Sequence, residues 1–187
     1  MKTFTKELRR LARQFINETM QDIKVEGKDE FNRNFERQAF FNEKWARRGS
    51  YDTDTGRSIL IKSGRLRKSI TSRIDGYTII YESTEPYAAI HNEGGTIAVT
   101  KRMKGYFWYL YRKALGSRTI RKDGALRNNK RNRALDSAAS FFRAMALKPV
   151  GSLITIPKRQ FIGEHPQFEQ LIRTIVTDNF NRIFNEK

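Results

Sequence analysis

An Asp-Gly dipeptide between two β-forming segments is the feature that most limits the folds open to this chain. Residues 69–74 and 77–81 are rich in β-branched and aromatic residues, and Asp75-Gly76 separates them. Asp-Gly supports the positive φ angles of a type I′ turn, which is a common two-residue connection in β-hairpins. The sequence therefore predicts two adjacent antiparallel strands, and any fold assigned to the chain must contain them.

Helical periodicity dominates the sequence before this hairpin. Apolar residues recur every three or four positions over about 3–24, which predicts an amphipathic helix that Gly27 would end. The period continues less cleanly over about 28–48, where we expect a second helix that stops at Gly49. Two helices should therefore precede the hairpin.

Short strands and helices alternate after the hairpin. Residues 86–91 should form a short helical or extended connector that leads to Gly94-Gly95 and a strand over 96–100. The later elements are a helix over about 101–115 capped by Thr100, a helix over about 134–147, a strand over 153–156 and a closing helix that begins at Pro166. This order predicts an α+β fold, in which a mostly antiparallel sheet packs with amphipathic N- and C-terminal helices.

Composition restricts the class of protein further. A chain of 187 residues with 13 Phe, 7 Tyr and 2 Trp has enough large side chains for one folded core. It has no cysteine, which excludes disulfides and thiolate sites. The first residues lack the apolar core of a signal peptide, and no run approaches the ~18 apolar residues of a membrane span. We expect a cytoplasmic protein without a membrane partner, unless it leaves the cell inside an assembly.

The formal charge of +17 is unevenly distributed along the chain. Residues 101–133 hold twelve Lys and Arg against the single acid Asp123. Such a field favours nucleic acid, an acidic protein or an acidic neighbour in an oligomer. We interpret 1–187 as a single domain in which 101–151 is a basic helical insertion, partly mobile when nothing is bound. The residues expected to contact DNA or an acidic partner are Arg118, Arg121, Lys122, Arg127, Lys130, Arg131 and Arg133.

A search for catalytic or metal-binding patterns finds little. The two histidines, His91 and His165, are 74 residues apart, and neither lies in a His-x-x-x-His or Glu-x-x-His pattern. Asp52 and Asp54 slightly resemble a calcium loop, but the other acidic positions of such a loop are missing. Gly94-Gly95 is not a phosphate loop, because no Lys-Ser or Lys-Thr follows it. We therefore expect no cofactor and no enzymatic activity.

Two alternatives remain open at this stage. His91-Asn92 resembles half of a His-Asn-His nuclease, and carboxylates near the hairpin could hold a metal, namely Asp75, Glu82, Glu85 and Glu93. Aromatic residues over 106–111 lie among Lys and Arg and could form a platform for stacked bases. At helical spacing, however, such aromatic residues more often form core and interfaces.

Three segments, taken in order, resemble a known family. They are Ile59-Leu-Ile-Lys-Ser-Gly-Arg-Leu-Arg-Lys-Ser-Ile70, Pro86-Tyr-Ala-Ala-Ile-His-Asn-Glu-Gly-Gly95 and Ile156-Pro-Lys-Arg-Gln-Phe-Ile-Gly163. This pattern is similar to that of the virion morphogenesis or tail-completion proteins of tailed bacteriophages and prophages. The resemblance covers about 58–184 with a gap, and the long insertion from about Lys101 to Gly151 departs from the family pattern.

The resemblance implies a structural protein at the head-tail junction or the head-proximal end of the tail. Its expected partners are further copies of itself in a ring, for example a hexamer, together with other neck or tail proteins and passing DNA. It would be made in the host cytoplasm and then enter the virion. The residues that carry the resemblance are Gly64, Leu66, Tyr87, Ile90, His91, Gly94, Gly95, Pro157, Arg159, Phe161 and Gly163.

The resemblance also suggests a role for each kind of motif residue. The glycines should form turns, and Ile70, Ile90 and Phe161 should lie in the core. His91 should be a structural residue that hydrogen-bonds the Gly-Gly turn. Arg159 would anchor a strand end or contact a neighbouring subunit. A basic nucleic-acid-binding module is the first alternative function, and a metal-dependent nuclease is the second.

Overall fold

The computed structural model describes residues 2–47 and 58–185, so Gly49, Asp52 and Asp54 lie outside the described residues. The chain packs as two compact units. We call the first the core unit; it contains residues 1–45, 58–93 and 159–187. We call the second the basic unit; it contains residues 46–57 and 94–158. The expectation of a single domain stays a prediction.

One helix, α1 (Lys2–Arg37), replaces the two helices expected at the start of the chain. The predicted end at Gly27 is wrong, because the helix continues through this glycine. A glycine inside a helix costs only about 1 kcal/mol relative to alanine, which tertiary packing can offset. The packing partner here is Tyr81 of the core unit, whose hydroxyl lies where a Cβ of Gly27 would be.

The predicted second helix over 28–48 is also wrong beyond Arg37. Gln38 and Phe41 both have positive φ, so the backbone leaves the helical path and forms a short antiparallel pair, β1 (Ala39–Phe40) with β2 (Glu43–Lys44). This turn buries three aromatic side chains, Phe40, Phe41 and Trp45. A continued helix would place these residues on more than one face, so the turn serves the core better.

The predicted hairpin is confirmed as β3 (Ile70–Asp75) and β4 (Thr78–Ser83), with Asp75 paired to Thr78. The turn differs from the expected type I′. Its two central residues are Gly76 and Tyr77, and only Gly76 has positive φ. This is the φ pattern of a type II′ turn, which places glycine at the first central position.

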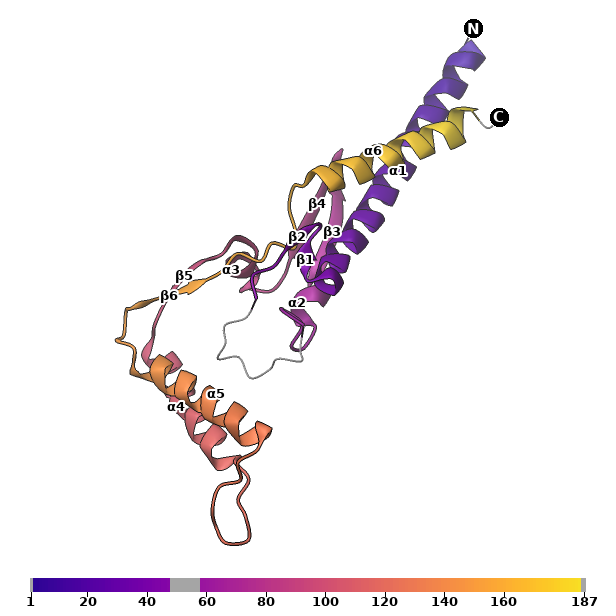
Figure 1. The fold of residues 1–187 in the computed structure, drawn as a ribbon. Helices are drawn as coiled ribbons and strands as arrows, with labels where there is room; N and C mark the ends of the chain where they lie inside the picture. The colour runs from indigo at the N-terminus through magenta and orange to yellow at the C-terminus, as the bar shows by residue number, and fades with distance from the viewer. Residues whose placement is uncertain (1, 48–57, 186–187) are drawn as a thin grey trace. The chain divides into compact units, whose positions relative to one another are not determined.

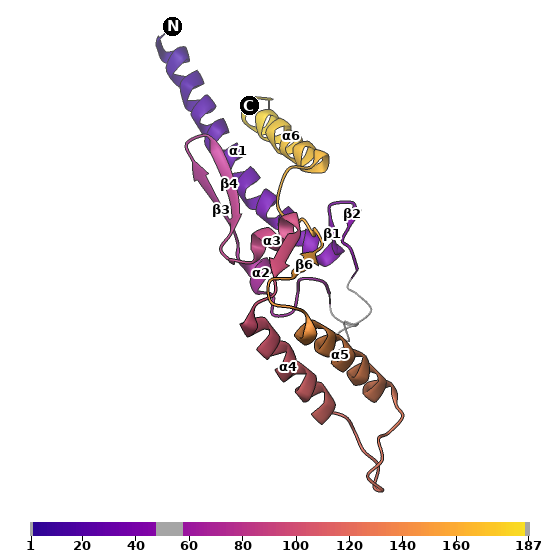
Figure 2. The ribbon, with the colours of Figure 1, turned by 90° about the vertical axis from the view of Figure 1, so that its left-hand side faces the viewer.

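Short helices flank the hairpin, and a helix closes the core unit. Helix α2 (Arg65–Lys68) precedes β3, and α3 (Ala88–Glu93) forms the expected connector after β4. Helix α6 (Pro166–Phe180) begins at the predicted proline and runs into a π-helical turn, η1 (Asn181–Asn185). Figures 1 and 2 show α6 beside α1. The main core cluster lies where α1, β1, α2 and β3 meet, and its buried residues are Phe31, Phe35, Phe40, Phe41, Trp45, Leu66, Ile70, Ala88 and Phe161.

The basic unit is a helical hairpin joined to a β-ribbon (Figure 2). Strand β5 (Gly95–Ala98) pairs antiparallel with β6 (Leu153–Ile156), and α4 (Lys101–Gly116) packs on α5 (Lys130–Leu147). Thr100 caps α4 as predicted, since its hydroxyl oxygen accepts a hydrogen bond from Met103 N at 3.1 Å. Helix α5 starts four residues earlier than predicted, because Asn129 provides its N-cap.

The α+β class with antiparallel pairing is confirmed, with helices at both ends of the chain. The strands form three separate two-stranded antiparallel sheets, whereas we expected one mostly antiparallel sheet. A two-stranded ribbon is marginal alone, so each one depends on helices or on neighbouring segments for stability. No helix in the described part of the chain is long and apolar enough to cross a membrane.

Candidate functional site

The second and third motifs meet in the core unit around Phe161. The Phe161 ring is buried and packs against Phe35 with 5.3 Å between ring centroids. Backbone contacts fix the segment that carries it: Arg159 N donates to His91 O at 2.8 Å, and Trp45 Nε1 donates to Gln160 O at 2.7 Å. We call residues 159–162 the anchor segment, because groups from distant parts of the chain hold its backbone in place.

Two asparagines complete the contacts of the anchor segment. Asn92 Oδ1 accepts hydrogen bonds from Phe161 N at 2.9 Å and from Ile162 N at 3.1 Å. Asn34, with 0% of its surface exposed, donates from Nδ2 to Phe161 O at 3.3 Å and accepts at Oδ1 from Phe41 N at 2.9 Å. A buried side-chain amide is stable only when it is hydrogen-bonded, and these partners meet that need.

Sequence analysis missed both asparagines as functional residues. Asn34 lies within the apolar stripe of α1, beside Phe35. A polar residue in such a stripe is a signal in the sequence that could have identified it as a buried side chain with hydrogen-bond partners. Asn92 was noted only as the neighbour of His91. Its role depends on a segment about seventy residues further along the chain, which no local pattern indicates.

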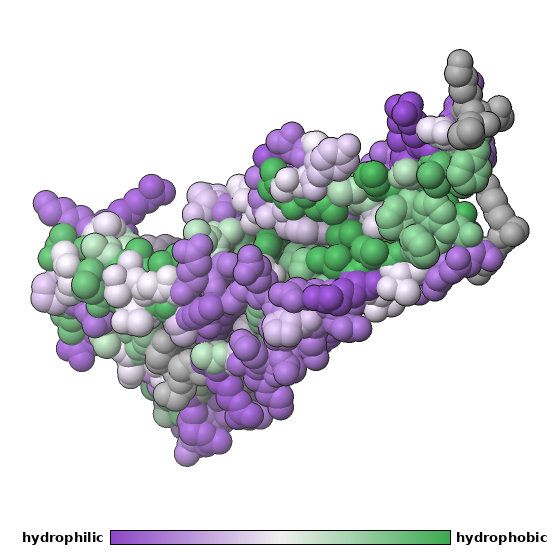
Figure 3. All heavy atoms as spheres, turned by 90° about the horizontal axis from the view of Figure 1, so that it is seen from above, coloured by the Kyte–Doolittle hydropathy of each residue, from purple (hydrophilic) through white to green (hydrophobic). Residues whose placement is uncertain are grey.

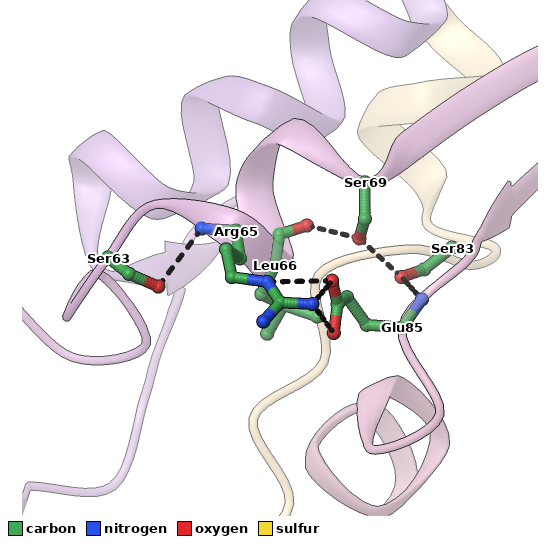
Figure 4. A network of polar contacts seen from close by, with 6 residues as sticks. All are labelled: Ser63, Arg65, Leu66, Ser69, Ser83 and Glu85. Atoms are coloured by element: carbon green, nitrogen blue, oxygen red, sulfur yellow. Dashed lines mark hydrogen bonds and ion pairs between the residues drawn. The ribbon is translucent and has the colours of Figure 1, made fainter.

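The first motif contributes buried residues to the same core and forms a polar network beside it. Leu66 and Ile70 are buried, and Gly64 begins α2 with φ +71°, a left-handed conformation that favours glycine. Figure 4 shows the Arg65 guanidinium against the Glu85 carboxylate, with 3.0 Å between Nη2 and Oε1.

The same network continues through two serines. Ser69 Oγ donates to Leu66 O at 2.7 Å and lies 2.6 Å from Ser83 Oγ, which accepts from Glu85 N at 3.3 Å (Figure 4). These contacts tie the end of α2 to the residues that follow β4. The first motif is therefore joined to the start of the second.

In the basic unit the two glycines of the second motif face the third. Gly94 has φ +75°, and a Cβ there would lie 2.8 Å from Lys158 N, so only glycine fits without a shift of the backbone. Gly95 pairs with Ile156 at the start of the β5–β6 ribbon. Pro157 follows β6 and is exposed. In the core unit, Gly163 has φ +144° and ends the third motif.

His91 does not have the contact that we expected for it. Its Nδ1 is buried and has no hydrogen-bond partner in the described part of the chain, while its backbone carbonyl holds Arg159. Burial, together with the nearby positive charge of Arg159, lowers the pKa of His91. Tyr87 lies edge-on to the ring with 5.9 Å between centroids, and Ile90 is only half-buried, so it is not a core residue. His91 is thus held as a neutral packing residue.

The carboxylates of the nuclease alternative lie in ion pairs or on the surface. Arg73 is 3.6 Å from Asp75 and 3.5 Å from Glu82, Glu85 pairs with Arg65, and Glu93 is exposed. Within residues 2–47 and 58–185, no three His, Asp or Glu side chains converge as a metal site would require. The other histidine, His165, accepts from Gln167 N at 3.1 Å and so caps α6. Among the described residues, the carboxylates considered for the nuclease alternative are therefore not gathered around one point.

The basic residues singled out by sequence surround the connection between α4 and α5. Arg118 pairs with Asp136 at 3.1 Å. Arg127 donates from Nε to Ile120 O, and Arg133 donates to Asn128. The remaining four, at the tip and in the first turn of α5, are exposed: Arg121, Lys122, Lys130 and Arg131.

Comparison of the sequence with known proteins identifies the family of this chain. The sequence model of the phage virion morphogenesis family matches residues 2–181, which include all three motifs, the whole basic unit and most of the core unit. The chain belongs to the phage virion morphogenesis family. No curated protein and no solved structure matches it. The resemblance found in the three motifs is therefore confirmed, and membership indicates a structural protein of the phage virion.

Proposed function

We propose that this phage virion morphogenesis protein acts in tail completion or head-tail joining, as one subunit of a ring at the neck or at the head-proximal end of the tail. It would assemble in the host cytoplasm, contact other neck or tail proteins and remain in the virion. The observation that carries the proposal is an apolar groove on the core unit that none of the described residues fills.

The groove has a volume of about 460 Å³ and lies among α1, β4 and α6. The residues that line it are Met20, Ile23, Phe31, Tyr77, Ile79, Tyr81, Ile162, Gly163, Glu164, Phe168 and Ile172. Figure 3 shows a band of hydrophobic surface running toward the ends of the chain between hydrophilic margins. A small-molecule site usually adds several convergent polar groups. An exposed apolar patch of this kind marks a contact with another protein.

The N-terminal part of α1 in a second copy is the occupant that we propose. Its apolar face is exposed, since Phe4 is 75% and Leu8 is 49% accessible. It cannot fold back into its own groove, because Phe4 and Met20 lie on one continuous helix and are about 24 Å apart at 1.5 Å per residue. The segment carries an ion pair between Arg10 and Glu7, and it also carries Lys6, Arg9 and Arg13. These three cations complement Glu164, the one charged residue among the described residues of the groove lining.

A contact between two different patches has a direct consequence for assembly. The helix end and the groove are different surfaces of one subunit. Each subunit can therefore place its helix end in the groove of one neighbour and accept the helix end of another neighbour in its own groove. Such heterologous contacts close into a ring when the rotation between subunits allows it. The same surfaces at the open end of an incomplete ring would accept other apolar partners of the neck or tail.

The test measures particle mass by light scattering after size-exclusion chromatography. The wild-type chain should form an oligomer, and Leu8→Asp should reduce it to a monomer with an unchanged far-UV circular dichroism spectrum. Asn17→Asp is the matched control, since it adds the same charge at an exposed polar position of α1 and should assemble normally. A strictly monomeric wild type at tens of micromolar, or an intact oligomer in Leu8→Asp, would contradict the proposed interface.

The place in the virion needs a second measurement. A phage that lacks the gene should accumulate separate heads and tails under the electron microscope, and wild-type protein supplied in the host should restore joined particles. Leu8→Asp should fail to restore them, whereas Asn17→Asp should succeed. Joined, infectious particles without the gene would refute the role in tail completion.

A further inference from the structure

The tip of the α4–α5 hairpin has a defined shape because one buried side chain holds it together. Asn132, only 3% exposed, accepts at Oδ1 from Thr119 N at 2.9 Å and donates from Nδ2 to Thr119 O at 2.8 Å and to Arg127 O at 2.7 Å. Above it, Ile120 and Leu126 form an antiparallel bridge. The two arms of the connecting loop are thus fixed to the first turn of α5.

Positive charge at this tip is almost uncompensated. Residues 94–158 contain fifteen Lys and Arg against two acids, Asp123 and Asp136. Asp136 pairs with Arg118, and Asp123 accepts from Ala125 N within the turn. The four exposed cations have no ion-pair partner in the part of the chain that the structure describes: Arg121, Lys122, Lys130 and Arg131. Close cations that repel one another destabilise the unit, and a bound polyanion would relieve that repulsion.

The surroundings of these cations favour nucleic acid over an acidic protein. The centre of a protein interface is apolar and depleted in lysine, whereas surfaces that bind nucleic acid are far more positively charged. At this tip the exposed large apolar side chains are those of Ile120 and Leu126, and they lie among the exposed cations named above. Lys130 and Arg131 begin α5, whose first turn has no acidic residue, so the positive end of the helix dipole adds to their charge.

We infer that the α4–α5 tip is a preformed contact surface for the phosphate backbone of DNA. The contacts come from flexible Lys and Arg side chains on a fixed loop, and contacts of this kind carry no base-specific information. Binding at this surface is therefore independent of the DNA sequence, which suits DNA that must move past it. This contact does not depend on the ring proposed above, since one chain carries the whole surface.

The test measures binding of the full chain to a fluorescein-labelled 30-base-pair duplex of mixed sequence, by anisotropy at 50 to 250 mM NaCl. The tip variant replaces four residues with glutamine: Arg121→Gln, Lys122→Gln, Lys130→Gln and Arg131→Gln. The matched control removes the same charge from exposed positions of the core unit: Lys44→Gln, Lys62→Gln, Lys68→Gln and Arg173→Gln.

Each phosphate contact contributes about 0.9 to the slope of log K against log salt, so four contacts correspond to about 3.6. The magnitude of this slope should be smaller by about 3 to 4 in the tip variant than in the wild type, and the control should keep the wild-type slope. A second duplex of unrelated sequence should bind equally well. Equal slopes in the tip variant and the control would overturn the proposal, and so would strong discrimination between the two duplexes.

Two further measurements separate the possible partners. Competition by an unlabelled single strand against the labelled duplex shows whether the surface requires a duplex. The exposed rings of Tyr106 and Tyr109 could stack on the free bases of a single strand. Either form of DNA supports the phosphate contact. Poly-L-glutamate should displace the duplex poorly, and displacement as effective as that by DNA would assign the surface to an acidic protein. The tip variant should retain the wild-type particle mass, which distinguishes a lost DNA contact from a lost ring.

Discussion

Gly27 offers a direct test of how the core unit is packed. In an ordinary exposed helix, replacing glycine by alanine stabilises the protein by about 1 kcal/mol. We expect the opposite at this position of α1. A Cβ on Gly27 would overlap the Tyr81 hydroxyl, lie 2.8 Å from Tyr81 Cζ and lie 3.1 Å from Phe168 Cε2. These separations are below the 3.5–4.0 Å at which carbon atoms attract one another.

Tyr81 cannot move aside without losing other contacts. Its ring packs edge-on against Phe31, with 5.1 Å between centroids, and its hydroxyl donates to Ile23 O at 2.5 Å. Burial raises the pKa of Tyr81 to about 12, so the phenol keeps the proton that it donates. Overpacking costs about 1–3 kcal/mol, and loss of the hydrogen bond adds about 1 kcal/mol. After the gain in helix propensity, Gly27→Ala should destabilise the core unit by roughly 1–3 kcal/mol.

Tryptophan fluorescence during urea denaturation can measure this change. Trp45 lies in the core unit and Trp108 in the basic unit, so a Trp108→Phe background reports on the core unit alone. The midpoint should fall in Gly27→Ala, and Tyr81→Leu should remove most of the penalty because the obstructing ring is gone. A midpoint that rises in Gly27→Ala, as in an exposed helix, would refute the packing argument.

Three further predictions concern the anchor segment and the tip. Asn92→Ala should cost roughly 2–4 kcal/mol in urea denaturation, because two backbone N–H groups lose their acceptor, whereas Asn92→Asp, which keeps the oxygen, should cost much less. The pKa of His91 is lowered below 6.5 in the folded state, so stability should be full above pH 6.5 and fall as the pH drops below it; His91→Gln should flatten this dependence between pH 7 and pH 5. Asn132→Ala should weaken DNA binding, measured by anisotropy, and lower the stability of the basic unit by roughly 2–4 kcal/mol without moving the Trp45 transition.

Elements with strong local signals could be predicted from sequence. Asp75-Gly76 located the hairpin, Thr100 marked the start of α4, and Pro166 marked the start of α6. Each signal acts within a few residues, through φ preference or capping of free backbone groups. The turn type was still wrong, because strand register, which long-range packing helps to set, moved the loop by one residue to Gly76-Tyr77.

Features that depend on distant contacts could not be predicted. Gly27 was interpreted as a helix end, and nothing near it in the sequence indicates that Tyr81 occupies the space beside it. Asn34 donates to Phe161 O, 127 positions away, and accepts from Phe41 N in the turn that follows α1, so it links that turn to the anchor segment. The motifs marked which segments matter, but the side chains that join them lay outside the motifs or were overlooked within them.

The separation of charge between the two units supports different tasks for them. The core unit holds nineteen Lys and Arg against sixteen Asp and Glu, whereas the basic unit holds eighteen against four. In the core unit, Glu30 lies within 3.0 Å of Arg33, and Glu36 lies 2.6 Å from Arg67. Charge that serves solubility alone would be mixed over the whole surface.

Nearly neutral core units can approach one another through the apolar groove without strong repulsion. Identical basic units brought together in an oligomer would repel, and the phosphates of DNA would offset that repulsion. Added salt acts on the two contacts in opposite directions, because it screens the repulsion between copies and weakens phosphate binding. The apolar contact and the phosphate contact can therefore be separated by ionic strength alone, even though a single chain carries both.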